Sequence, residues 1–328
     1  MKRRNFLQKG ALAGAAAIVG STTEVAAQNT PPALPASPAQ SVTPIMTAAG
    51  EAIGPGEVQV IGDNQRSGSD FMVDVLKSLG FEYVAANPGS SFRGLHESII
   101  NYGGNHAPEM ITCMHEESAV AIAHGYYKAE GKPMLVAAHG TVGLQHASMA
   151  LYNAWCDRVP VYLVIGNYND AAVRRPAEWY HGVQDAALMV RDFTKWDDTP
   201  WSLTHYAESA VRAYNLAVTP PMAPVVLVLD GILQEQGADI GKLPKIPKAP
   251  VPSVPQGDSA SVEQAARMIV AAENPVFVVD RVARTPNGMK LLVELAELVG
   301  AGVVDQTSRM NFPTRHPLNQ SQRAGAAI

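Results

Sequence analysis

An acidic residue beside a histidine is the strongest chemical signal in this sequence. His115 and Glu116 stand where a short apolar segment, residues 110–114, gives way to small apolar residues that predict a helix over residues 117–129. In an α/β protein, this junction lies at the carboxyl edge of a parallel sheet, where such proteins bind ligands. The helix dipole alone also favours an acidic residue there. A zinc-protease motif is excluded, because its second histidine would have to stand at Ala119.

Other side chains that can move protons or form hydrogen bonds lie in turns and loops. Ser90 belongs to the run Asn-Pro-Gly-Ser-Ser at 87–91, His139 precedes the run Gly-Thr-Val-Gly, and His316 lies in Phe-Pro-Thr-Arg-His-Pro at 312–317. A serine in a turn or a histidine in a loop can equally be structural. The glycine run after His139 is not a phosphate loop, since it lacks the Lys-Ser/Thr ending. These residues are therefore candidates for acid–base work, with structural alternatives left open.

Alternating helical and apolar segments must position these residues. The residue patterns predict helices over 71–79, 95–100, 117–129 and 147–155, and strands over 81–86, 110–114, 134–138, 159–165 and 225–229. Continuous apolar runs such as 159–165 are typical of strands buried on both faces. The alternation predicts an α/β fold, a doubly wound parallel sheet covered by helices.

Composition and proline-rich segments divide the chain into regions. With 328 residues, 47% hydrophobic and 17% charged, it has the make-up of a folded α/β protein, and its net charge of −5 argues against nucleic acid as a partner. Residues 1–27 carry paired arginines, a weakly apolar stretch and a small-residue end, which resembles a twin-arginine export signal and predicts a periplasmic protein with no membrane span after cleavage. A Pro/Ala-rich linker is expected over 28–62, a first domain over 63–241, a Pro-rich linker over 242–255 and an incomplete second α/β domain over 256–328. Cys113 and Cys156 are expected to be buried free thiols, although one disulfide between them remains open.

Several motifs occur together, in order, and carry a family resemblance. They are the turn at 87–91, the helix that follows His115-Glu116, the run 139–143, and Leu-Tyr-Asn-Ala-Trp at 151–155 leading to 159–161. This ordered set resembles thiamine-diphosphate enzymes of the benzoylformate decarboxylase and acetolactate synthase group. The resemblance covers about residues 66–328 and implies a flavodoxin-like domain that binds the aminopyrimidine ring of the cofactor.

The resemblance also implies roles for individual residues. Glu116 would bond to N1′ of the aminopyrimidine and so activate the cofactor, which acts as an electron sink on a 2-oxo acid substrate. Burial among Ala119, Ile122 and Ala123 would raise the pKa of that carboxyl group. Ser90 would bind the substrate carboxylate, and His139 and His316 would shuttle protons. Four further residues would line the cofactor: Pro88, Gly89, Gly143 and His146. His146 stands where the family usually has a small polar residue, which predicts a different pocket shape or substrate.

The resemblance leaves the activity of the chain open. The family holds Mg²⁺ and the diphosphate through Gly-Asp-Gly in a further domain, and this sequence contains no such motif. One reading is the N-terminal part of a 2-oxo acid decarboxylase or carboligase whose diphosphate-binding half lies elsewhere. Another is a non-catalytic regulatory or assembly subunit. An α/β hydrolase is disfavoured, since Gly-x-Ser-x-Gly is absent. Association into a homo- or hetero-oligomer through the first domain is expected in either case.

Overall fold

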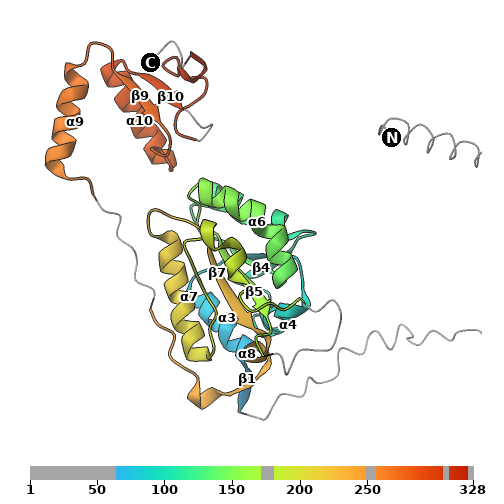
Figure 1. Cartoon of the computed structure of the whole chain (residues 1–328). Helices are drawn as coiled ribbons and strands as arrows, with labels where there is room; N and C mark the ends of the chain where they lie inside the picture. The colour runs from blue at the N-terminus through green and yellow to red at the C-terminus, as the bar shows by residue number, and fades with distance from the viewer. Residues whose placement is uncertain (1–63, 171–180, 249–255, 306–309, 324–328) are drawn as a thin grey trace, which may run out of the picture. The chain divides into compact units, whose positions relative to one another are not determined.

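A computed structural model describes residues 64–170, 181–248, 256–305 and 310–323 (Figure 1). The expected export signal and the linker over 28–62 lie outside these residues. Among the described residues, no helix combines the length and the apolar character needed to cross a membrane.

A six-stranded parallel sheet forms the centre of the first domain, with strand order β3-β2-β4-β5-β7-β6. Its strands are β2 (Tyr83–Ala86), β3 (Glu109–Thr112), β4 (Leu135–Ala138), β5 (Tyr162–Asn167), β6 (Trp196–Asp198) and β7 (Val225–Asp230). The inner strands β4, β5 and β7 are buried along their whole length, as their unbroken apolar sequences predict. This is the predicted flavodoxin-like, doubly wound architecture.

Helices cover both faces of the sheet, and alternate strand residues feed two separate cores. On one face, α3 (Gly68–Ser78) and α7 (Leu203–Val218) pack against side chains such as Val84 and Tyr162. On the other face, α5 (Glu116–Glu130) and α6 (Thr141–Cys156) pack against neighbours such as Ala85 and Leu163. Figure 1 shows α7 and α6 on opposite sides of the strands. A parallel sheet needs both layers, because its strands have no polar face to turn to water.

Short elements complete the first domain. A two-stranded antiparallel pair joins β1 (Gln65–Ser67) to β8 (Gly237–Asp239), and α4 (Arg93–Glu97) and α8 (Gly231–Glu235) are single short helices. Further short helical turns are η1 (Ser90–Phe92), η2 (Ser98–Tyr102), η4 (Ala187–Phe193) and η5 (Ile240–Lys242). Leu243 and Ile246, in the segment expected as a linker, pack against the core on the α3 side of the sheet.

The C-terminal part has its own small core. It consists of α9 (Ser259–Ala271), β9 (Val276–Val279), α10 (Pro286–Val299), β10 (Gly302–Asp305) and the turn η6 (Ser321–Arg323), with β9 and β10 paired in parallel. Residues such as Leu292, Ala296 and Phe312 form the core.

Several expectations need correction. The structure begins α6 at Thr141, six residues before the predicted start at 147, because Leu144 is fully buried and extends the helix into the glycine run. Sequence reasoning missed α7 and β6 altogether. Cys113 is a buried free thiol as expected. Cys156 is also free, but it is exposed, since it is the last residue of α6.

Candidate functional site

The chain reverses direction within the sheet between β2 and β4. After β2 the chain crosses to β3 at the edge and then returns to β4 on the opposite side of β2. The carboxyl ends of strands at such a switch point form the usual ligand crevice of an open α/β sheet. Here the turn that starts at Asn87 follows β2, His139 follows β4, and Glu116 begins the helix after β3. The topology therefore gathers the candidate residues at one edge.

Glu116 is the first residue of α5 and is only 3% exposed. Its carboxylate receives hydrogen bonds from the Asn87 side chain, from its own backbone N–H and from His146. Burial raises the pKa of Glu116, but these hydrogen bonds and the nearby charge of His146 outweigh it, and the pKa lies below its ordinary value. The sequence-based prediction that burial would raise the pKa of Glu116 is therefore wrong in direction. Ile122 was expected to help bury the carboxyl group, but it is 41% exposed.

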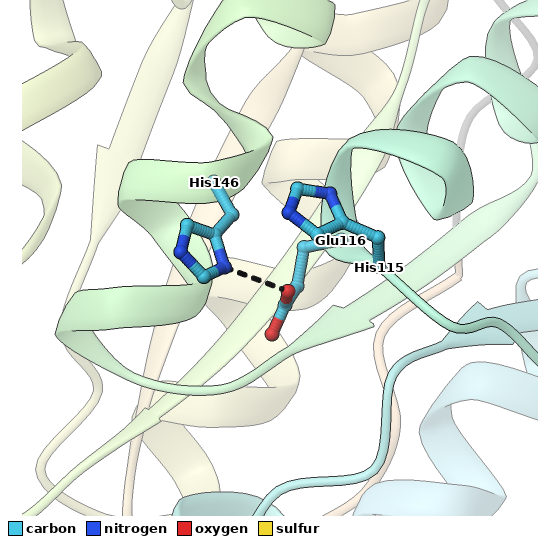
Figure 2. Close-up of side chains that lie close together, drawn as sticks. All are labelled: His115, Glu116 and His146. Atoms are coloured by element: carbon cyan, nitrogen blue, oxygen red, sulfur yellow. Dashed lines mark hydrogen bonds and ion pairs between the residues drawn. The ribbon is translucent and has the colours of Figure 1, made fainter. Parts of the chain in front are cut away.

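Two histidines lie against this carboxylate (Figure 2). His146, from the second turn of α6, places Nδ1 3.3 Å from Oε2 of Glu116. Its ring stacks on His115, with centroids 4.7 Å apart and planes 19° from parallel. His115 is the N-cap of α5 and accepts a hydrogen bond from the backbone N–H of Glu117 at its Nδ1, over 3.2 Å. An ionised carboxylate only accepts hydrogen bonds, so Nδ1 of His146 must carry a proton.

The same three side chains could be considered as a metal site, since their ligand atoms lie within 4.8 Å of one another. A metal must lie in the plane of each imidazole that binds it, and the planes of two stacked rings do not converge on one point. The lone pair of His115 Nδ1 is also engaged in capping α5. The arrangement therefore suits hydrogen bonding and proton exchange better than metal coordination.

His139 follows β4 at the same edge of the sheet. Its Nδ1 is 3.2 Å from Oγ of Ser91, which also accepts a hydrogen bond from the backbone N–H of Gly140 at 2.8 Å. Burial and the neighbouring ring of His181, 5.0 Å away, lower the pKa of His139, while the charge of Glu116 opposes that shift. His139 is therefore held as a neutral imidazole that can accept a proton.

The Asn-Pro-Gly-Ser-Ser turn contributes differently from what was expected. Ser91, which sequence reasoning passed over, is buried and contacts His139, whereas Ser90 and Pro88 are exposed. Asn87 was also missed as a partner of Glu116, although it opens the motif that was noted. Both residues could have been found from the position of the turn directly after a strand at the switch point.

Glycines leave room around the two key side chains. A Cβ atom on Gly143 would stand 2.8 Å from Oε1 of Glu116 and 3.0 Å from Cβ of His139. One on Gly89 would stand 2.7 Å from the ring of His139. Both approaches are closer than real Cβ atoms come, so both positions require glycine for the observed packing.

His316 lies in the C-terminal part. Its Nε2 is 3.1 Å from Oε1 of Glu297, its Nδ1 accepts a hydrogen bond from the backbone N–H of Leu318, and its ring packs edge-on against Phe312. Within this part, both ring nitrogens are thus engaged. Glu297 was not predicted, since it lies on α10, far from His316 in sequence.

Comparison with known proteins agrees with this geometry. Residues 66–189 match the family described as thiamine pyrophosphate enzyme, N-terminal TPP binding domain. The chain is 27% identical to benzoylformate decarboxylase from Pseudomonas aeruginosa over 252 residues, covering 74% of this chain and 45% of that protein. It is 23% identical to the mitochondrial acetolactate synthase catalytic subunit from Aspergillus candidus, covering 73% and 35%. The crystal structure of benzoylformate decarboxylase from Polynucleobacter necessarius superposes with a TM-score of 0.65 at 26% identity, covering 77% of this chain and 46% of that one.

The matched part of the first domain is therefore similar to the N-terminal TPP-binding domain of the thiamine pyrophosphate enzymes. The relatives named above are benzoylformate decarboxylases and an acetolactate synthase. The chain spans less than half the length of these relatives.

Proposed function

We propose that the crevice at the switch point binds the aminopyrimidine ring of thiamine diphosphate, with Glu116 bonded to N1′. The observation that carries the proposal is a buried, ionised carboxylate at the sheet edge of a domain matched to the TPP-binding family. When bound, the cofactor supplies a carbon nucleophile and an electron sink. Glu116 holds the proton at N1′ on which that reactivity depends, and Asn87 keeps the carboxylate oriented.

The residues present fit such a ring. The glycines at 89 and 143 bring backbone close to His139 and Glu116 without a side chain between them. His139, with its lowered pKa, is a neutral imidazole and so has a nitrogen lone pair that can accept a proton from a reacting group. Pro88 and Gly89 belong to the turn that follows β2, and Gly89 lies against the ring of His139.

The wider activity follows from the relatives as a proposal. We infer that the chain is the N-terminal part of a 2-oxo acid decarboxylase or carboligase, with Ser90 contacting the substrate carboxylate and His316 as a second proton shuttle. The diphosphate and its Mg²⁺ would be held by another domain or chain, because the sequence contains no Gly-Asp-Gly motif, which the family uses to hold them. Export by the twin-arginine route to the periplasm remains part of this proposal.

Association through the first domain completes the proposal. The surface of α5 and α6 exposes apolar side chains, with Ile122 at 41%, Met149 at 58% and Tyr152 at 49% exposure. Exposed apolar groups that lie on adjacent helices favour contact with another subunit. Sedimentation of the purified protein across a range of concentrations would test this association.

The experiment compares two adjacent glutamates. Saturation-transfer NMR would follow binding of thiamine diphosphate with Mg²⁺ to the purified full chain, using wild type, Glu116→Gln and Glu117→Gln. Glu117 is exposed and one residue away, so its variant is the matched control. Transfer to the aminopyrimidine protons should be seen for wild type and Glu117→Gln and be weakened in Glu116→Gln. Equal saturation transfer in both variants, or no transfer in the wild type, would contradict the proposal that Glu116 binds the aminopyrimidine ring.

A second measurement separates the catalytic and non-catalytic alternatives. Exchange of the C2 proton of thiamine diphosphate for deuterium reports activation of the cofactor directly. Faster exchange with wild type than with Glu116→Gln supports the enzyme reading. Binding without any acceleration, also in the presence of a complementary diphosphate-binding chain, supports the regulatory or assembly subunit.

A further inference from the structure

The buried position of Glu116 raises the question of how its proton reaches water. The side chain of Glu116 is 4% exposed, and its hydrogen-bond donors are Asn87, its own backbone N–H and His146. An amide side chain and a backbone N–H do not release protons at physiological pH. A carboxyl group that must gain and lose a proton in such surroundings needs an ionisable neighbour that also reaches solvent.

His146 meets both requirements. Its Nδ1 contacts Oε2 of Glu116 at 3.3 Å, and its side chain is 54% exposed. Figure 2 shows its second ring nitrogen on the side of the ring away from the carboxylate. The two nitrogens of an imidazole can hold protons independently, so the ring can accept a proton at one and release one from the other.

Other ionisable groups near Glu116 do not offer this path. His115 stacks on His146, but its Nδ1 accepts a hydrogen bond from the backbone N–H of Glu117 and so has no proton to pass to Glu116. Glu117 is exposed, and it is not among the groups that hydrogen-bond to the Glu116 carboxylate. The charge of Glu116 acts on His139, but no hydrogen bond joins the two side chains, and Nδ1 of His139 is engaged by Ser91.

We propose that His146 carries protons between solvent and the Glu116 carboxylate. A proton from water binds Nε2 of His146, and the proton on Nδ1 moves to Oε2 of Glu116, which leaves a carboxylic acid and a neutral ring protonated at Nε2. The reverse sequence returns the carboxylate. Each cycle takes one proton from solvent and delivers one to Glu116, so charge and atoms balance without another reactant.

The inference rests on the proposed function only for the use made of that proton, namely sharing it with the aminopyrimidine. The transfer itself belongs to this chain and is measurable in the free protein. His146 acts through Glu116 and is a positioning and proton-transfer residue, not one that touches the substrate. Its stack on His115 holds the ring plane, and with it the direction of Nδ1.

The first test is the tautomer of His146, read by ¹⁵N NMR of the labelled full chain at a pH where the ring is neutral. Imidazoles in water prefer the proton on Nε2, whereas a ring that donates to Glu116 keeps it on Nδ1. The Nδ1 form is expected for wild type and for Glu117→Ala, with a return to the Nε2 form in Glu116→Ala. A wild-type ring protonated at Nε2 would overturn the proposal.

The second test is the rate of proton exchange at Glu116, from ¹³C relaxation dispersion of its carboxyl carbon near its titration midpoint. His146→Gln should slow exchange by about tenfold or more, the low end of what a positioned proton-transfer group contributes. Added free imidazole should restore the rate in His146→Gln, while His106→Gln, an exposed histidine elsewhere, should match wild type. Wild-type exchange in His146→Gln would refute the relay. Failure of thiamine diphosphate to bind would instead remove the proposed function and leave these results unaffected.

Discussion

Replacing Gly143 with alanine tests whether the site depends on space beside Glu116. The added Cβ would stand 2.8 Å from Oε1 of Glu116 and 3.0 Å from Cβ of His139. Carbon and oxygen atoms without a bond between them normally stay more than about 3.4 Å apart, so one neighbour must move by roughly half an ångström. Gly143 lies in the first turn of α6, and nothing in its helical backbone itself demands glycine.

Two energies oppose each other in this variant. Alanine is a better helix former than glycine by up to about 1 kcal/mol, which stabilises the fold. Overpacking in a closely packed region costs about 1–3 kcal/mol. The balance predicts that Gly143→Ala lowers the free energy of unfolding by up to about 2 kcal/mol and displaces the Glu116 carboxylate from His146.

Gly125 provides a matched control on α5. It lies within that helix, is exposed, and a Cβ there would meet nothing within 4 Å. Gly125→Ala should therefore raise the free energy of unfolding by about 0.5–1 kcal/mol. Urea unfolding of both variants gives the difference, and it should be repeated at two protein concentrations because α5 belongs to the surface we propose for association.

Binding completes the comparison. Calorimetric titration with thiamine diphosphate and Mg²⁺ should show weaker binding for Gly143→Ala and unchanged binding for Gly125→Ala. If Gly143→Ala is stabilised as much as Gly125→Ala and binds the cofactor like wild type, the close approach to Glu116 does not constrain the site, and the reasoning from that distance is wrong.

Further predictions concern titration and the core. The pKa of Glu116 is lower in the folded than in the unfolded protein. Its contribution to stability is therefore fully present above the unfolded pKa and is lost as the pH falls through the folded pKa. In Glu116→Gln, the free energy of unfolding, measured with urea at a series of pH values, should depend less on pH in the acid range. Burial is the larger cause of the lowered pKa of His139 and the charge of His181 the smaller, so His181→Gln should raise that pKa only in part, as followed by NMR titration. Tyr162 is fully buried and donates a hydrogen bond to the carbonyl of Ala210 at 3.1 Å, so Tyr162→Phe should cost about 1 kcal/mol in thermal or urea unfolding.

Much of the fold could be predicted from sequence because the inner strands are unbroken apolar runs. A strand that is buried on both faces consists almost entirely of apolar residues. The strands β4, β5 and β7 are buried in this way. The helix α7 was missed although the sequence carries its pattern. Its buried residues Leu203, Tyr206 and Ala210 recur at helical spacing.

The site could be predicted in position but not in electrostatics. The location of Glu116 follows from a single junction between a strand and a helix. The sign of its pKa shift depends on donors from Asn87 and His146, which come from two other segments of the chain. Burial alone predicts an increase in the pKa of Glu116. Only the folded structure shows that the hydrogen bonds lower this pKa by more than burial raises it.

The lowered pKa changes how Glu116 must work. In the proposed site, a carboxylate that is ionised in the free domain would meet N1′ as an acceptor, so the proton they share would have to be delivered and not merely retained. Its contact with His146, at 3.3 Å, is long for an N–H···O hydrogen bond and lies on the exposed side of the crevice. This contact is therefore the easiest of the carboxylate's hydrogen bonds to exchange when a ring nitrogen arrives. The same histidine can keep the carboxylate charged in the empty site and supply the proton once the ring is bound, which accounts for an ionisable residue at position 146.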